Sequence, residues 1–379
     1  MFQPESIDEI NTWWSTRVDQ QVPIHWRHRW RSANTTERAV RDLSITHLNR
    51  VIDYPHRDMT VTVQTGMTVA ELDQILKEHH QVLPIDVPEP DRMTIAEMIC
   101  GNWFGSRCAG HGTLRDWLLG VTAIDGRGRI IHSGGRVVKN VAGYDVQKFL
   151  IGSRGELAIP LEASFKVIPI PEANLNCVYQ TDDFSILQEA WQALRILPFD
   201  FQTFDLTSSG RLEISVSGLP QSNKALRDQI QSTLTSFAEI KVIQVPDNAD
   251  EIDSWKTIVE SITHPQDRHF AIRVGVRPSQ TVEVLQLAAA CGLKAIGHAS
   301  RGAIVVTGAL NVVTSVQNKL LTRLAELNAN VECLEASKSL YDLIHKNFEQ
   351  TKLSPLSEKI RNVFDPQRLL KSNAVMVED

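Results

Sequence analysis

The sequence contains few cysteines, and their positions argue against two kinds of structural site. Five cysteines occur in 379 residues, at Cys100, Cys108, Cys177, Cys291 and Cys333. Their number is odd, they lie far apart, and no two form a C-x-x-C pair, so neither a disulfide framework nor a zinc site is expected. We expect reduced thiols, most of them in the core, and no bound metal.

Long apolar runs and leader-like features are also lacking. The segment from Met1 to Gln20 carries Glu5, Asp8, Glu9 and Arg17, unlike the basic start and unbroken apolar run of a signal peptide. No window approaches the roughly eighteen apolar residues that a membrane-spanning helix requires. The sequence therefore predicts a soluble, cytoplasmic protein.

Positive charge is not in excess. The formal net charge is -6, whereas a nucleic-acid-binding protein needs a basic face or stripe. Several catalytic motifs are missing as well: the sequence has no Ser-His-Asp arrangement, no H-E-x-x-H, no P-loop and no carboxylate cluster with metal-ligand spacing. A polyanion partner is not expected, and any chemistry has to come from other residues.

The length and the residue pattern predict two domains. At 379 residues the chain exceeds the size at which one core usually keeps growing. The run Pro169-Ile170-Pro171 follows a predicted strand at 161–168, and the pattern changes beyond it. We therefore place one domain at 1–171 and a second at 172–379, which ends in a helical tail.

The first domain mixes helices and strands. Capping boxes that begin at Ser6 and Thr68 predict two helix starts. Alternating apolar and polar residues over 59–64 predict a strand, and two apolar runs that flank a D-G-R-G turn predict a hairpin over 118–131. A short helix is expected over 145–151.

The second domain alternates strands with longer helices. The predicted helices are 184–196, 221–237, 250–263, 279–291 and 312–327, and the predicted strands are 211–217, 239–244, 269–276, a pair within 297–308, and 331–335. We expect an antiparallel sheet with helices on one face, so the fold class is α+β.

The most specific stretch is Gly134 to Asp145, which reads G-G-R-V-V-K-N-V-A-G-Y-D. It predicts a glycine turn, a short extended piece, and a glycine that allows close backbone approach just before a helix. The simpler interpretation is a tight loop whose glycines only satisfy backbone geometry.

Five segments in order resemble an FAD-binding family. They are 112–116 (G-T-L-R-D), 119–121 (L-G-V), 125–128 (D-G-R-G), 134–145, and 152–157 (G-S-R-G-E-L). In order and spacing they resemble the FAD-binding domain of the vanillyl-alcohol-oxidase (VAO) or p-cresol-methylhydroxylase (PCMH) type, and within it the glycolate oxidase E subunits. The resemblance covers residues 37–171 and is weaker beyond.

This resemblance implies a two-domain PCMH/VAO-type fold that holds FAD between an N-terminal flavin domain and a C-terminal cap. It implies an FAD-dependent oxidoreductase subunit that oxidises a small 2-hydroxy acid, such as glycolate to glyoxylate, beside a D-type flavin subunit and an iron-sulfur subunit. The residues it places at the cofactor are Asn102, Gly105, Gly112, Thr113, Asp116, Lys139, Gly143, Gly155 and Ile159. Glycines and small residues there would let N–H groups approach a pyrophosphate, although Asn102 by itself is equally a capping residue.

Two stretches depart from the family pattern. Bulky residues from Trp26 to Ser32 replace an early glycine run, and Ala96-Glu97 replaces a glycine pair, where an inward-pointing Glu97 would repel phosphate. Three interpretations of the 26–31 loop stay open. Its arginines grip the pyrophosphate, or it forms a solvated basic surface, or Trp30 and Trp103 fill the space of the flavin.

The second domain holds the candidate catalytic residue. Gly297 to Gly302 reads G-H-A-S-R-G and resembles a G-H-A-G-x-G turn that brings a histidine near the flavin in relatives that oxidise 2-hydroxy acids. His298 is the candidate base for the hydroxyl proton or donor to the substrate carboxylate, and a structural turn histidine is the alternative. Arg273 and Arg301 are candidates for binding the carboxylate.

The leading hypothesis is an FAD-binding subunit of a glycolate oxidase-like complex. In that hypothesis the cofactor does the chemistry, and protein residues orient and tune it. The alternative is a non-catalytic interaction subunit of such a complex with a degenerate flavin site, because a fold alone does not determine a function.

Overall fold

In the computed structural model, the chain forms two compact units. The structure describes residues 2–24, 26, 43–135, 145–237, 239–243, 255, 258–259, 269–309, 316–348, 355–371 and 376–377. Unit 1 comprises Met1–Phe104, Thr113–Ile170 and Thr351–Val375, and unit 2 comprises Gly105–Gly112, Pro171–Gln350 and Met376–Asp379. The tail therefore differs from the predicted division, because most of it belongs to unit 1.

Unit 1 is built on an antiparallel sheet of five described strands. Their order is β1 (Val51–Asp53), β2 (Thr60–Gln64), β6 (Ala158–Lys166), β4 (Leu118–Asp125) and β5 (Ile130–Gly134). A separate two-stranded pair joins β3 (Gln81–Val82) and β7 (Ile168–Pro169). The predicted hairpin is confirmed as β4 and β5, which close around the D-G-R-G turn.

Short helices complete unit 1. They are α1 (Ile7–Gln20), α2 (Val69–Lys77), α3 (Ile95–Gly101), α5 (Leu114–Trp117), α6 (Gln147–Leu150) and α14 (Pro355–Phe364), with a 3-10 turn at His56–Asp58. The capping box at Thr68 is confirmed, since the Glu71 side chain accepts the N–H of Thr68 and the Thr68 hydroxyl accepts that of Glu71. At α1 the Ser6 hydroxyl caps the helix as predicted, but the Glu9 carboxylate accepts the N–H of Glu5 instead.

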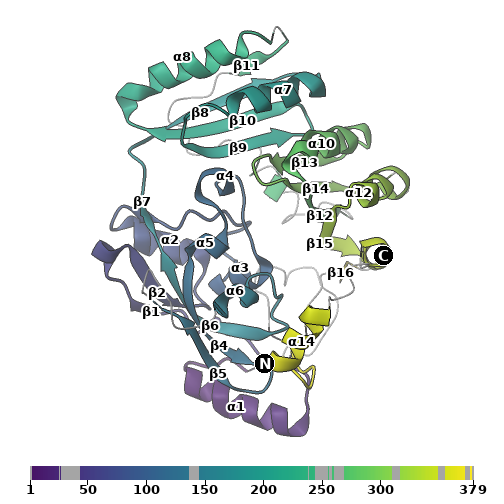
Figure 1. The fold of residues 1–379 in the computed structure, drawn as a ribbon. Helices are drawn as coiled ribbons and strands as arrows, with labels where there is room; N and C mark the ends of the chain where they lie inside the picture. Colours follow the sequence, from purple (N-terminus) through teal and green to yellow (C-terminus); the bar gives the residue numbers. More distant parts are fainter. Residues whose placement is uncertain are drawn as a thin grey trace. The chain divides into compact units, whose positions relative to one another are not determined.

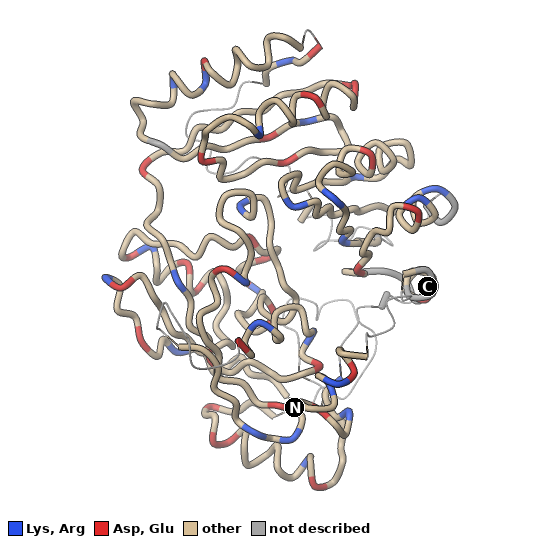
Figure 2. The backbone as a smooth tube through the Cα atoms, viewed as in Figure 1, with Lys and Arg blue, Asp and Glu red and all other residues tan. Residues whose placement is uncertain are grey.

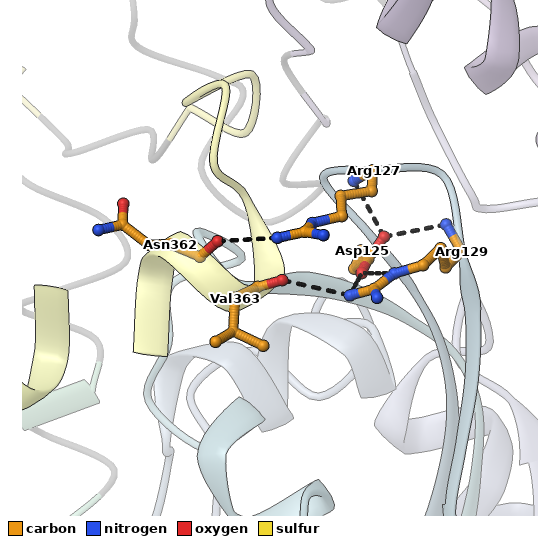
Figure 3. Close-up of polar contacts among 5 residues, drawn as sticks. All are labelled: Asp125, Arg127, Arg129, Asn362 and Val363. Atoms are coloured by element: carbon orange, nitrogen blue, oxygen red, sulfur yellow. Dashed lines mark hydrogen bonds and ion pairs between the residues drawn. The ribbon is translucent and has the colours of Figure 1, made fainter. Parts of the chain in front are cut away.

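The C-terminal segment is fastened to unit 1 by the hairpin turn, as Figure 3 shows. Asp125, which is fully buried, accepts the backbone N–H groups of Arg127 and Arg129, and its other oxygen accepts the Arg129 guanidinium at 2.8 and 2.6 Å. Arg129 also donates to the carbonyl of Val363 at 3.2 Å, and Arg127 donates to that of Asn362 at 3.1 Å. The two cations thus satisfy carbonyls of the last turn of α14, where the helix dipole is negative.

The residues after α14 enter the core of unit 1. Leu369 and Leu370 are buried in one cluster with Trp26, and the backbone of Ile24 pairs with Leu370 as an isolated parallel bridge. Ile24 donates its N–H to the Leu369 carbonyl at 2.8 Å. This buried pairing explains why the tail does not belong to unit 2.

Unit 2 is built on a sheet of nine described strands. Their order is β11 (Lys241–Ile243), β8 (Ala173–Gln180), β10 (Arg211–Gly218), β9 (Phe201–Thr207), β13 (Lys294–His298), β14 (Ala303–Ala309), β12 (His269–Gly275), β15 (Asn330–Ser337) and β16 (Met376–Val377). The β15–β16 pair is parallel, and the other pairs of this sheet are antiparallel. Strands β8 and β9 were not predicted.

Helices cover one face of this sheet (Figure 1). They include α7 (Phe184–Leu194), α8 (Asn223–Leu234), α10 (Thr281–Ala290) and α12 (Thr322–Glu326), and unit 2 also contains α4 (Cys108–His111) and α13 (Lys338–Phe348). The predicted α+β arrangement is confirmed, because a buried apolar cluster lies between sheet and helices. The predicted helix at 250–263 lies mostly outside the described residues.

Charge is interspersed along both units. Figure 2 shows positions of Lys and Arg interspersed with positions of Asp and Glu along the backbone of both units. Among the helices that the structure describes, none combines the length and apolarity needed to cross a bilayer.

Candidate functional site

Asn102 ends helix α3. Its backbone is left-handed, with φ 46° and ψ 53°, and its N–H donates to the carbonyls of Ile99 and Met98. A Cβ placed on Gly152 would lie 3.4 Å from the Asn102 Cβ, so the loop after α6 packs on this helix end. The capping interpretation of Asn102 is confirmed, and its contact with a cofactor stays a prediction.

Gly155 lies directly against the indole of Trp26. The φ of Gly155 is +75°, and a Cβ there would lie 2.2 Å from Trp26 Nε1. Trp26 itself is buried with Ile159 in the core of unit 1, and Ile159 also pairs with Ile124 between β6 and β4. The absence of a side chain at Gly155 therefore serves packing against Trp26.

Glu97 does not point its charge toward an external anion. Its carboxylate accepts the N–H and hydroxyl of Thr94 at 2.7 and 2.9 Å, which forms a capping box at the start of α3. Glu97 is 2% exposed, and Ala96 is fully buried in the core. The T-x-x-E spacing was visible in the sequence and could have predicted this cap.

Trp103 also has a local role. It is buried, and its indole covers Gly101, where a Cβ would lie 2.4 Å from Trp103 Nε1. This contact gives the bulky side chain of Trp103 a structural role at the end of α3. Trp30 and the arginines of the 26–31 loop lie outside the described residues.

The remaining predicted cofactor residues are divided between the units. Thr113 and Asp116 begin α5 in unit 1, where the Asp116 carboxylate accepts the N–H of Thr113 at 2.8 Å. Gly105 and Gly112 belong to unit 2, and Gly112 has a positive φ of 81°. Lys139 and Gly143 lie outside the described residues.

Lys148, which was not predicted as a site residue, binds the C-terminal end of α5. The Lys148 ammonium donates to the carbonyls of Arg115 and Leu118, the latter at 2.7 Å. Burial lowers the pKa of Lys148, and the nearby Asp145 carboxylate acts in the opposite direction.

The space beside each glycine of unit 1 indicates where a cofactor could come close to the backbone. Most of its described glycines face protein atoms, but beside Gly135 no atom of the other described residues lies within 4 Å of the position that a Cβ would take. Gly135 follows Gly134, whose φ is +72°, at the start of the glycine-rich run. The described part of this turn therefore leaves room for a phosphate-bearing group to approach the backbone at Gly135.

His298 forms a buried pair in unit 2. Its Nδ1 lies 2.7 Å from Asp205 Oδ1, and the two residues are register partners on strands β13 and β9. His298 and Asp205 are 0% and 2% exposed, and the Trp255 ring lies 5.5 Å from the imidazole, centre to centre. The structure therefore assigns the predicted histidine a carboxylate partner that the sequence did not indicate.

A second carboxylate lies beside this pair. Glu213 on β10 is the register partner of Asp205, is 2% exposed, and forms an ion pair with Arg211 at 3.1 Å. Its neighbours Leu212 and Ile214 belong to the helix-covered core, so Glu213 points to the opposite face. Glu213, Asp205 and His298 thus lie in one row across three strands. The sequence could not indicate this row, because it depends on the β9–β10 register and β9 was not predicted.

The two candidate carboxylate-binding arginines contact protein groups. Arg273 forms an ion pair with Glu332 across β12 and β15 at 3.1 Å and is 8% exposed. Arg301 is exposed, and its Nε donates to the Cys108 carbonyl at 3.2 Å. Their role in substrate binding stays a prediction.

Comparison with known proteins agrees with this architecture. Residues 1–134 match a family model described as an FAD binding domain. A solved structure of alkyldihydroxyacetonephosphate synthase superposes with a TM-score of 0.65 at 14% identity, over 97% of this chain and 74% of that chain. The similarity shows a shared fold, which is the two-domain PCMH/VAO type.

Three curated relatives match part of the chain. D-2-hydroxyglutarate dehydrogenase of Xanthomonas citri pv. viticola is 28% identical over 53% of this chain and 44% of its own length. Glycolate oxidase subunit GlcE of Escherichia coli is 33% identical over 33% and 36%, and subunit GlcD of Bacillus subtilis is 28% identical over 48% and 40%.

The matched segments span less than half of each of these three relatives. The match over residues 1–134 indicates FAD as the cofactor.

Proposed function

We propose that the chain is the FAD-binding subunit of a glycolate oxidase-like enzyme that oxidises a small 2-hydroxy acid to the 2-keto acid. The observation that carries this proposal is the buried His298–Asp205 pair, which supplies a proton acceptor in a chain whose other part matches an FAD binding domain. Relatives named as glycolate oxidase subunits and 2-hydroxyglutarate dehydrogenase support the substrate class.

The chemistry divides between cofactor and protein. When bound, FAD supplies the acceptor for the hydrogen that leaves C2 of the substrate. In unit 1, the turn at Gly135 is the place where backbone groups would hold the phosphates. In unit 2, His298 takes the proton of the substrate hydroxyl, which has to leave as the carbonyl forms.

Partners and compartment belong to the same proposal. A D-type flavin subunit and an iron-sulfur subunit would complete the enzyme and pass the electrons on, in the cytoplasm. Glycolate is the first substrate to test, with D-lactate and D-2-hydroxyglutarate next, because relatives are named for acids of this class.

One observation favours a second function, that of a non-catalytic interaction subunit. The Trp26 indole fills the space beside Gly155, at a position where the family resemblance places cofactor contact. A chain with a degenerate flavin site would keep this packing and serve the complex through its surface.

Visible absorbance distinguishes the catalytic subunit from the non-catalytic interaction subunit. The purified chain, incubated with FAD and freed of excess, should show a stoichiometric flavin band that bleaches when glycolate or another 2-hydroxy acid is added without oxygen. A chain that retains no flavin, alone or with its partner subunits, would contradict the catalytic proposal and support the interaction subunit.

A further inference from the structure

We propose that Asp205 is a positioning residue that keeps the proton of neutral His298 on Nδ1 and leaves Nε2 as the proton acceptor. The inference deepens the proposed oxidation of a 2-hydroxy acid and rests on it. It adds a carboxylate that neither the glycine-rich run nor the histidine turn indicated.

The register of the sheet places the three side chains in one row. Glu213 is paired with Asp205 between β10 and β9, and Asp205 is paired with His298 between β9 and β13. Directly paired residues of antiparallel strands share a face, with Cβ atoms about 5 Å apart. The row is therefore a property of the backbone pairing, and all three residues are at most 2% exposed.

The Asp205 carboxylate determines which ring nitrogen carries the proton. Asp205 Oδ1 lies 2.7 Å from His298 Nδ1. A carboxylate can only accept a hydrogen bond, so a short contact of this kind requires the proton on Nδ1. The Nε2 atom of the neutral ring then carries a lone pair and can take a proton.

Asp205 is placed to hold the charge that His298 gains when Nε2 takes a proton. Because an uncompensated buried charge is costly, the neighbouring carboxylate stabilises the imidazolium that the reaction forms. Glu213 lies next in the row and is paired with Arg211 at 3.1 Å.

The reaction uses this arrangement in a balanced way. The O–H bond of the 2-hydroxy acid breaks and its proton goes to His298 Nε2. FAD, when bound, would be the two-electron oxidant that takes the hydrogen leaving C2 with its electron pair. A 2-keto acid results, and the imidazolium is held by Asp205 until the proton is released to solvent.

The first test reads the tautomer and needs no turnover. The full chain is labelled with 15N-histidine, and the His298 signals are identified by their loss in His298→Gln. We expect the Nδ1–H form in the native protein and in Asp205→Glu, and a mixture of tautomers in Asp205→Asn. An Nε2–H form in the native protein, or an unchanged tautomer in Asp205→Asn, would overturn the inference.

The second test reads flavin reduction by the 2-hydroxy acid. Asp205→Asn should slow reduction by roughly 10³-fold or more, with little change in substrate affinity. Glu283→Gln changes a partly exposed side chain of α10 that is paired with Arg323, so it serves as the surface control and should keep the native rate. Thermal unfolding of each variant verifies that it is folded.

The two tests separate the inference from the proposed function. If no 2-hydroxy acid reduces the native protein, the proposed function fails, while the tautomer still decides the role of Asp205. If the native protein is reduced and Asp205→Asn is reduced equally fast, the oxidation stands and the positioning role is wrong.

Discussion

The carboxylate of Asp365 occupies the space into which a side chain on Gly126 would project. A Cβ on Gly126 would lie 2.3 Å from Asp365 Oδ1. Asp365 is fully buried, and its two oxygens accept the N–H groups of Leu369 and Leu370 at 2.9 Å each. The turn of the β4–β5 hairpin and the C-terminal segment are therefore fitted to each other.

The first prediction follows from this contact. Gly126→Ala should lower the free energy of unfolding by about 1–3 kcal/mol, because the added methyl has to displace a hydrogen-bonded carboxylate. Urea unfolding measures the change. Gly135→Ala is the matched control, since no atom in the part of the chain that the structure describes lies within 4 Å of its Cβ position, and it should change stability by less than about 1 kcal/mol. Equal losses in both variants would contradict the close fit.

The second prediction concerns Gly155 and Trp26. Gly155→Ala should destabilise unit 1 by more than about 2 kcal/mol, because it combines a left-handed backbone with a clash against the indole. Gly152→Ala has a similar φ of +76° but its nearest atom is 3.4 Å away, so it should cost only about 1 kcal/mol.

A double-mutant cycle isolates the indole contact. In a Trp26→Phe background, which removes the pyrrole part of the ring, Gly155→Ala should cost less than in the native chain. Additive losses, measured by urea unfolding, would show that the backbone conformation alone accounts for the effect.

The third prediction concerns Glu97. Glu97→Ala should reduce stability by about 1 kcal/mol, because the start of α3 loses its capping box. Glu97→Gln keeps an acceptor for the Thr94 N–H and should leave FAD affinity unchanged, since the carboxylate is already turned onto its own helix. Flavin fluorescence quenching measures that affinity, and a clear tightening in Glu97→Gln would indicate that the carboxylate faces the phosphates.

The fourth prediction concerns alkaline pH. Burial raises the pKa of the Cys100 thiol from 9.0 to about 12. The folded state therefore keeps this proton while the unfolded state releases it above about pH 9, so the stabilisation is complete below that pH and is lost as the pH rises toward 12.

Thermal unfolding from pH 7 to pH 11 provides the measurement. The native chain should lose more stability above pH 9 than Cys100→Ala, in which the linked ionisation is absent. In the folded protein at pH 8, Cys100 should resist a thiol reagent that labels the partly exposed Cys333. Parallel pH curves for the native chain and Cys100→Ala would show that Cys100 does not contribute.

Much of the local structure could be predicted because its signals are local. The box at Thr68, the hairpin around Asp125, and the alternation of strands with helices depend on residues only a few positions apart. Strands β8 and β9 were missed, and with them the partner of His298, because pairing between distant strands leaves little trace in either strand alone.

The sequence by itself determined the helix caps, the glycine turns, the α+β class and the resemblance to an FAD-binding domain, since backbone preference and side-chain pattern act over short distances. Only the tertiary structure decided what fills the space beside each glycine and which carboxylate meets His298. Asp365 at Gly126, Trp26 at Gly155, and Asp205 at His298 all come from distant parts of the chain. Such contacts follow from strand register and core packing, which the whole fold sets together.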